Sequence, residues 1–157
     1  MMHEPKQIMQ VLRDELALQT RHCKLLEAQE QALLTCDRGR FASLQEEHCG
    51  MLAALEAQDD VRRTTLTDEA GAPLTLSALK ERLPAASLPG LPALEDGLRR
   101  TLDRVQALTR SNQKLIQNEL NYLAFTLDLF VEAGRTADNG YGGGGRLTGR
   151  LLLDRRA

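Results

Sequence analysis

The sequence contains no tryptophan, and aromatic residues make up only 3% of its 157 residues. Leucine, alanine, glutamine, glutamate and arginine dominate instead, a composition that favours long helices and coiled coils over a mixed α/β domain. A chain of this length is expected to form one domain with a buried core.

Segments that direct a chain to a membrane are also missing. No apolar run approaches the roughly 20 residues that a membrane-spanning helix needs. The N-terminal sequence MMHEPKQIMQ lacks the basic and apolar parts of a signal peptide. The net charge of −2 argues against a generally basic nucleic-acid binder. We therefore expect a cytoplasmic protein that neither binds nucleic acid nor inserts stably in a membrane.

The usual catalytic and nucleotide-binding motifs are absent. No Walker loop, GxGxxG, HExxH or GxSxG occurs, and the glycine run at residues 142–145 lacks the Lys-Ser/Thr ending of a phosphate-binding loop. The only histidines are His3, His22 and His48, which indicate no Ser-His-Asp arrangement. The chain is expected to be no enzyme and to need no cofactor.

Cysteine is scarce, and Cys23, Cys36 and Cys49 form no CxxC pair. This usage predicts reduced thiols that serve as small core residues. The dipeptides His22-Cys23 and His48-Cys49 suggest zinc, whose ligands must lie about 2 Å from one centre. If the chain turns near residues 38–39, position 48 lies opposite position 29, roughly 10 Å along the helix from position 22. No metal site is therefore predicted.

Apolar periodicity predicts an all-α fold. The expected helices span residues of about 5–36, 40–66, 75–83 and 92–133. Between the first two, Gly39 can take a left-handed cap conformation and Asp37 can cap the next helix. Because this break is short, the two helices should be antiparallel neighbours.

These helices predict an elongated antiparallel bundle or coiled coil of three long helices plus a short connector helix. The connector, rich in proline and glycine, is expected to cover one end of the bundle. Gly134 is expected to end the last helix, so that residues 1–134 form the bundle. Residues 135–157 form a flexible tail rich in glycine, arginine and leucine.

The chain is organised around residues 110–131, where eleven of 22 residues are apolar and neither glycine nor proline occurs. One stripe of this helix should face the hairpin of the first two helices: Asn112, Ile116, Leu120, Leu123, Leu127 and Phe130. Leu115, Tyr122, Phe125 and Leu129 lie near one line on an adjoining face. A helix with more apolar surface than one stripe is buried on two sides or binds a partner.

Two stretches resemble the FlgN-like family of flagellar export chaperones. Residues 25–63, LLEAQEQALLTCDRGRFASLQEEHCGMLAALEAQDDVRR, are similar to the family's helical hairpin. Residues 108–130, LTRSNQKLIQNELNYLAFTLDLF, are followed by NGYGGGG. The family shows an Asn and two aliphatic residues at positions matching Asn112 and Leu115-Ile116, and a Tyr-Gly matching Tyr141-Gly142.

The resemblance implies a cytosolic chaperone of hook-associated proteins, the proteins of the hook–filament junction. Such a chaperone holds their helical terminal segments, prevents premature self-association and delivers them to the flagellar type III export apparatus. For such a chaperone, an amphipathic client helix is expected to lie along the exposed apolar side of the last helix. The candidate client-binding residues are the adjoining-face residues Leu115, Tyr122, Phe125 and Leu129, together with Asn112. The resemblance also makes Tyr141 and Gly142 the candidates for docking at the export gate.

Two alternatives stay open. The chain can be a structural or adaptor coiled coil without a client, whose excess apolar surface is buried in a homodimer. It can also be the chaperone of a non-flagellar type III secretion system, which the composition does not separate from a flagellar one.

Overall fold

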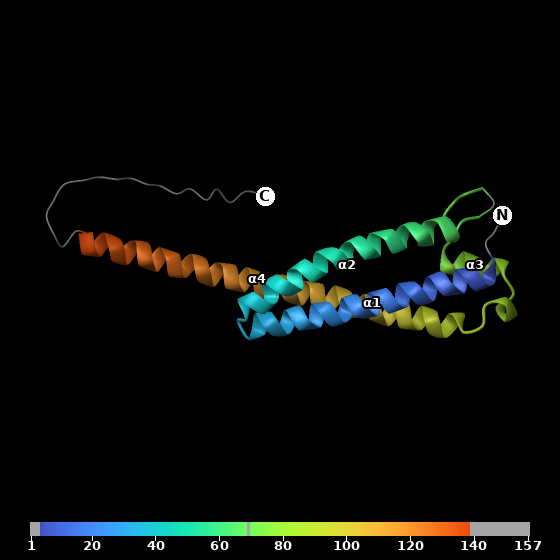
Figure 1. The fold of residues 1–157 in the computed structure, drawn as a ribbon, viewed down its shortest axis with the longest axis horizontal. Coiled ribbons are helices and arrows are strands. Elements are labelled where there is room, and N and C mark those ends of the chain that lie inside the picture. The colour runs from blue at the N-terminus through green and yellow to red at the C-terminus, as the bar shows by residue number, and fades with distance from the viewer. Residues whose placement is uncertain (1–3, 69, 139–157) are drawn as a thin grey trace. The chain divides into compact units, whose positions relative to one another are not determined.

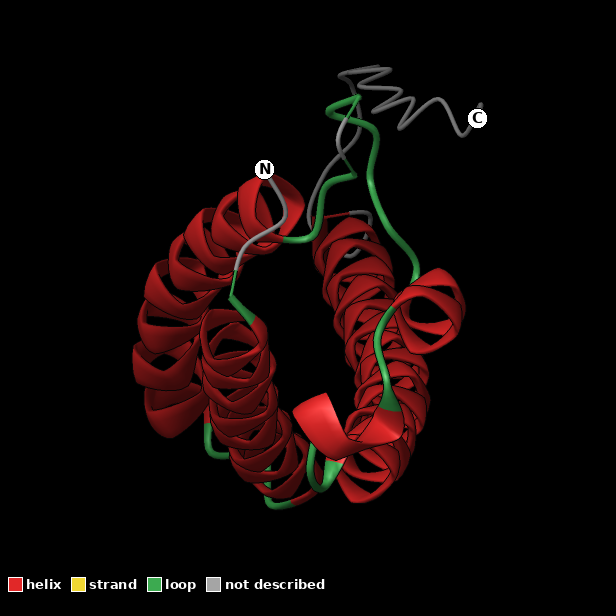
Figure 2. Cartoon of the chain, turned by 90° about the vertical axis from the view of Figure 1, so that its right-hand side faces the viewer, coloured by secondary structure: helices red, strands yellow, loops and turns green. Residues whose placement is uncertain are grey.

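A computed structural model describes residues 4–68 and 70–138, and these residues form an all-helical fold. The elements are α1 (Pro5–Leu34), α2 (Arg38–Thr65), α3 (Leu76–Arg82), the short 3-10 helix η1 (Ala85–Ser87) and α4 (Leu91–Asp138) (Figure 1). Loops alone join the helices in Figure 2, and Thr67 and Pro73 form an isolated β-bridge. The predicted all-α class is confirmed.

The chain divides into two compact units, Met1–Gln117 and Asn118–Ala157. The first unit contains α1, α2, α3 and the first part of α4. The described part of the second unit is the remainder of α4, up to Asp138. None of the described helices is long and apolar enough to cross a membrane.

α1 and α2 form an antiparallel hairpin. The connection bends at Cys36, whose φ of 55° lies in the left-handed region. The Asp37 side chain then caps α2 by accepting a hydrogen bond from the Arg40 amide at 3.0 Å. The predicted capping role of Asp37 is confirmed, whereas the left-handed position is at Cys36 and not at Gly39.

The main core cluster lies where the start of α1, α3 and the start of α4 meet. Its most deeply buried side chains include Ile8 and Leu12 from α1 and Leu79 from α3, which is 0% exposed. Leu91, Leu94 and Leu98 contribute from α4. Leu79 thus anchors the connector on this end of the unit.

α1 and α4 run parallel, with Arg104 donating to Glu27 and Ser111 donating to Glu30. Leu26 and Leu108 are almost completely buried farther along these two helices. α2, in contrast, buries only Thr65. It therefore attaches to α1 through half-buried side chains and polar contacts.

Two expectations about single residues are wrong. α4 does not end at Gly134 but continues to Asp138. Cys36 and Cys49 are exposed and Cys23 is only half-buried, so the cysteines are not core residues. Their positions on the polar sides of the hairpin and in its turn explain this exposure.

Candidate functional site

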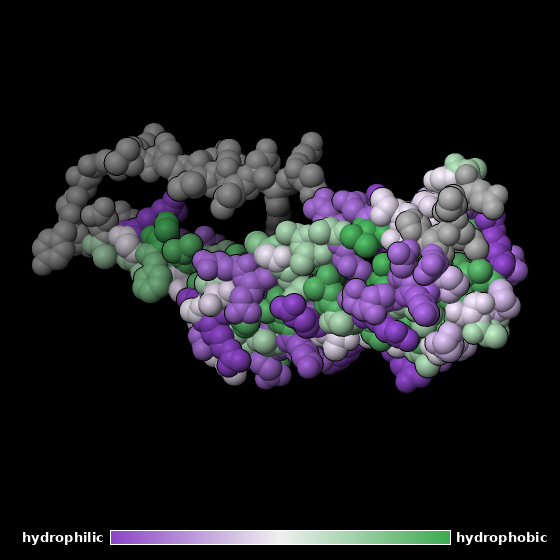
Figure 3. All heavy atoms as spheres, turned by 45° about the vertical axis from the view of Figure 1, so that its right-hand side comes forward, coloured by the Kyte–Doolittle hydropathy of each residue, from purple (hydrophilic) through white to green (hydrophobic). Residues whose placement is uncertain are grey.

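The described part of the second unit presents a large apolar surface. Its exposed large apolar side chains are between 54% and 71% accessible: Leu120, Tyr122, Phe125, Leu127, Leu129, Phe130 and Val131. Figure 3 shows part of this surface in green towards the end of α4. Large exposed apolar patches are typical of interaction surfaces, so this surface is the candidate binding site.

The surface has two faces, set by the spacing of three or four residues that brings side chains to one side of a helix. We call Leu115, Tyr122, Phe125 and Leu129 the first apolar face. We call Leu120, Leu123, Leu127 and Phe130 the second apolar face. The opposite side of the helix is polar and carries Asp128 and Arg135.

The structure separates the residues predicted for client binding into two environments. Tyr122, Phe125 and Leu129 are 63%, 61% and 54% exposed, whereas Leu115 is half-buried at the end of the first unit. Asn112 is buried, and its Nδ2 donates to the Leu26 carbonyl oxygen at 3.1 Å. Its predicted client contact is therefore not available in this conformation, because the side chain fills the space between α1 and α4.

The second apolar face also differs from its prediction. Asn112 is buried and Ile116 is half-buried, as expected for a stripe that faces the hairpin. Leu120, Leu127 and Phe130, however, are 54%, 64% and 71% exposed. Leu123 is half-buried. The expectation that the whole stripe packs on the hairpin is therefore wrong for Leu120, Leu127 and Phe130.

Acidic residues accompany the apolar surface. Residues 118–138 contain four acidic residues and one basic residue, Arg135, which gives a net charge of 1 − 4 = −3. Glu119 lies on one side of the first apolar face, and Asp128 and Glu132 lie on the other side. Tyr141 and Gly142, the residues predicted to dock at the export gate, lie outside the described residues.

The first unit contains a groove that the sequence reasoning missed. It runs between α1 and α2 and has a volume of about 530 Å³. Its apolar lining consists of Leu18, Leu25, Ala28, Leu44, Met51 and Ala54, with Gly50 at the edge. Arg21, Lys24 and Glu47 supply the charged rim. The signal in the sequence is the pair of small residues at positions 50 and 54, one helical turn apart.

Two histidines meet inside the hairpin. The Nε2 atoms of His22 and His48 are 3.0 Å apart, and the Gln29 amide lies 3.5 Å from His48 Nδ1. Burial lowers the pKa of both imidazoles, and the charge of His48 lowers the pKa of His22 further. The Nδ1 atom of His22 is buried without a hydrogen-bond partner.

This contact overturns the argument that separated the two histidines by about two helical turns. The helices pair in a different register, which brings His48 to His22 as well as to Gln29. Among the described residues, no group of three or more His, Cys, Asp or Glu side chains is placed to hold a metal ion.

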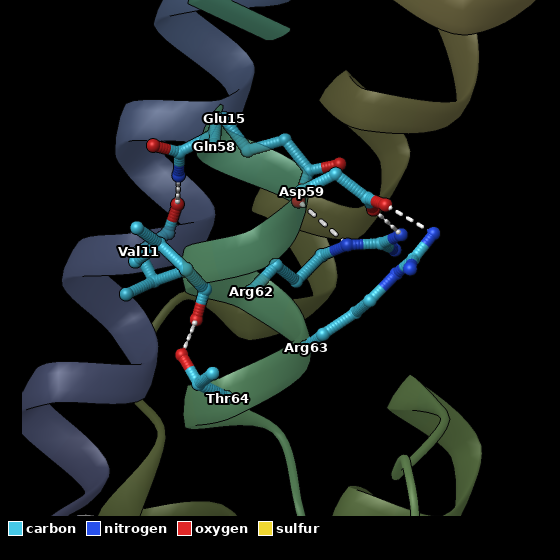
Figure 4. Close-up of polar contacts among 8 residues, drawn as sticks. Val11, Glu15, Gln58, Asp59, Arg62, Arg63 and Thr64 are labelled. Carbon is cyan, nitrogen blue, oxygen red and sulfur yellow. Dashed lines mark hydrogen bonds and ion pairs between the residues drawn. The ribbon is translucent and has the colours of Figure 1, made fainter. Parts of the chain in front are cut away.

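A charged network closes the other end of the hairpin (Figure 4). Arg62 and Arg63 contact the Asp59 carboxylate at 2.5 and 2.7 Å, and the Arg62 Nε lies 3.7 Å from Glu15. Burial raises the pKa of Glu15, while the nearby Arg62 lowers it. Gln58 donates to the Val11 carbonyl oxygen at 3.0 Å beside this network. The contacts join α2 to α1 and define a structural network.

Apolar faces of helices are among the surfaces through which proteins recognise one another. A model of the FlgN family, described as FlgN protein, matches residues 1–149. The chain therefore belongs to the FlgN family, and the predicted resemblance is confirmed. This membership indicates a chaperone of flagellum biogenesis and protein export. Comparisons with curated proteins and with solved structures give no match.

Proposed function

We propose that this chain is a cytoplasmic export chaperone of hook-associated proteins, the proteins of the hook–filament junction. It binds their helical terminal segments, prevents their premature self-association and brings them to the flagellar type III export apparatus. The observation that supports this proposal most is the exposed apolar surface of α4 between Leu120 and Val131.

The client is an amphipathic helix that lies with its apolar side along the first apolar face. Tyr122, Phe125 and Leu129 are spaced three and four residues apart, the spacing that matches one stripe of a partner helix. Aromatic side chains provide large contact areas at low entropic cost. Ordering a client segment costs about 2–5 kcal/mol, which keeps the complex reversible, as delivery requires.

Docking at the export gate is assigned to Tyr141 and Gly142 by the family's Tyr-Gly pattern. Replacing Tyr141 with alanine should leave client affinity unchanged and weaken association with the cytosolic domain of the gate. An equal loss of both activities would place the tail in the client site instead.

Client binding is tested with purified chain and the terminal segment of a hook-associated protein captured by pull-down from a flagellated strain. Phe125→Ala should weaken binding by about tenfold or more, which corresponds to about 1.4 kcal/mol. The melting temperature should change little, because Phe125 is 61% exposed. Isothermal titration calorimetry and thermal unfolding measure the two quantities separately.

Leu108→Ala is the matched fold control, because Leu108 lies on the same helix and is 1% exposed. It should lower the melting temperature without changing the affinity of the folded fraction. If Phe125→Ala instead destabilises the fold as much as Leu108→Ala and leaves affinity unchanged, the first apolar face is not the client site. Capture of proteins from a different type III system would support the non-flagellar alternative.

A further inference from the structure

We propose that the groove between α1 and α2 binds the first apolar face of α4 from a second copy of this chain. Two copies would exchange this contact reciprocally and form a two-fold symmetric dimer. The dimer would be the resting form of the protein, and a client would displace it. The self-association stands on the surfaces described above, whereas the competition with a client rests on the proposed function.

The groove has the shape and chemistry that a helix requires. Its floor is formed by aliphatic side chains such as Leu25 and Met51, and its α2 edge carries the small residues Gly50 and Ala54. A Cβ atom added at Gly50 would meet nothing within 4 Å, so this edge is open. A third helix can therefore approach the hairpin closely and cover the half-buried side chains that line α2.

The lengths of the two surfaces also agree. The α1 side of the groove extends from Leu18 to Ala28, ten residues or about 15 Å at 1.5 Å per residue. The exposed residues of the first apolar face extend from Tyr122 to Leu129, seven residues or about 10 Å. The groove accommodates the complete exposed part of the face and about one further helical turn.

The charges beside the two surfaces favour the groove, and not a second α4, as the partner of the first apolar face. The first apolar face has acidic residues on both sides, and residues 118–138 have a net charge of −3. Two such helices packed on each other would bring like charges together. The groove instead presents Arg21 and Lys24 on its α1 rim and Glu47 on its α2 rim, a net charge of +1. The second apolar face is flanked by Arg135 on the side away from Glu119, so its charge matches the groove less well.

A two-fold symmetric dimer contains the contact between groove and α4 twice. A contact of a few helical turns in one groove is small, but a reciprocal pair brings the buried area towards the roughly 1,200 Å² at the lower end of specific interfaces. An interface of this size is expected to dissociate readily. Reversible dissociation is what a chaperone needs if its client competes for the same face.

Sedimentation equilibrium of the purified full chain at pH 7.5 tests the dimer. The wild-type chain should change from monomer to dimer as its concentration rises through the micromolar range. Ala54→Glu, which places an acid in the groove, and Phe125→Ala should each raise the dimer dissociation constant by about tenfold or more. A chain that stays monomeric into the high micromolar range would overturn the proposal.

Each variant has a matched control. Ala53→Glu introduces the same charge at the exposed neighbouring position outside the groove lining. Phe130→Ala removes the same ring from the second apolar face of the same helix. Both controls should dimerise like the wild type. Circular dichroism spectra should be equal for all four variants, since the four positions are outside the buried core.

Mixing the variants tests reciprocity. Ala54→Glu keeps an intact α4 and Phe125→Ala keeps an intact groove, so a mixed pair retains one of the two contacts. The mixture should associate more strongly than either variant alone and less strongly than the wild type. No recovery on mixing would overturn the proposal, as would wild-type dimerisation by Ala54→Glu, which would mean that α4 pairs with itself.

The outcome of the client experiment is independent of the outcome of the dimer experiment. Ala54→Glu should bind a hook-associated segment at least as tightly as the wild type, because it removes the competing dimer without changing α4. If no such segment binds the wild-type chain, the proposed function is wrong, while the sedimentation result still decides the dimer. If the segment binds without shifting the monomer–dimer equilibrium, the competition is wrong.

Discussion

The contact between His22 and His48 predicts that the stability of the hairpin depends on pH. Their Nε2 atoms are 3.0 Å apart, a distance at which two neutral rings share one proton, with one ring donating it and the other accepting it. A second proton would place two positive charges at this distance. The neighbouring polar groups, Gln29 and Gln45, are neutral and provide no negative charge to compensate.

The sign follows from the pKa values in the folded and unfolded states. Burial lowers the pKa of both histidines in the folded chain from the ordinary value of 6.5, and His48 adds a repulsive contribution at His22. The unfolded chain therefore binds more protons than the folded chain below this value. The stabilising contribution is complete above pH 6.5 and is lost as the pH falls through 6.5 towards the folded pKa values.

The expected change in the free energy of unfolding with pH is large enough to measure. Each histidine that is protonated only in the unfolded state reduces the free energy of unfolding by at most about 1.4 kcal/mol per pH unit. Two histidines set an upper limit of about 2.7 kcal/mol per pH unit, against a typical total stability of about 5–15 kcal/mol. Urea unfolding followed by circular dichroism, between about pH 7.5 and pH 5.5, gives this slope.

The control replaces both residues, His22→Gln and His48→Gln, because glutamine keeps a polar side chain that does not titrate in this range. The double variant should lose most of the slope, whatever its absolute stability. His3 is present in both proteins and cancels in the comparison. Burial raises the pKa of Glu15, so its titration works in the opposite direction and also cancels. An equal slope in both proteins would refute the reasoning.

Two further predictions concern the fold. Leu108→Ala should lower the free energy of unfolding by about 2–5 kcal/mol in urea, because Leu108 is 1% exposed and its loss leaves a cavity; a loss below about 1 kcal/mol would contradict its core position. Asp37→Ala should cost about 0.5–2 kcal/mol, since it removes the cap on the Arg40 amide, while Asp37→Asn should retain most of the stability.

The sequence predicts α1, α2 and α4 well because each is long and its apolar residues recur with helical spacing. Register is harder to predict. A turn centred between residues 38 and 39 places position 48 opposite position 29. The observed connection is centred on Cys36, which places position 48 opposite 2 × 36 − 48 = 24. A shift of the turn centre by one residue moves the position opposite residue 48 by two residues. For this reason the sequence predicts that the two histidines lie apart, although they are in contact.

Periodicity also predicts which face of a helix is apolar, but not how far its partner extends. α1 ends at Leu34, four residues beyond Glu30, which accepts the hydrogen bond from Ser111. The stripe on α4 continues with the same spacing to Phe130, although the partner helix has ended. Gly134 shows a similar limit of prediction from sequence. A glycine inside a helix costs about 1 kcal/mol of stability, which does not prevent the helix from continuing past it.

The apolar surface of α4 is held on a helix that is formed before any partner binds. Residues 110–131 contain no glycine or proline, and the same helix is anchored in the first unit by Leu91, Leu98 and Leu108. Since the chain has already ordered this backbone, a partner helix meets a prepared face and the cost of ordering falls on the partner alone. Exposure of that face carries a risk of uncontrolled association, which the acidic residues beside it reduce through repulsion between like helices. In the proposed dimer, the basic-rimmed groove of the same chain would select one reversible self-contact from among the alternatives. Under the two proposals, the apolar anchors, the acidic flanks and the matching groove would keep this surface accessible to a client and still protect it from aggregation.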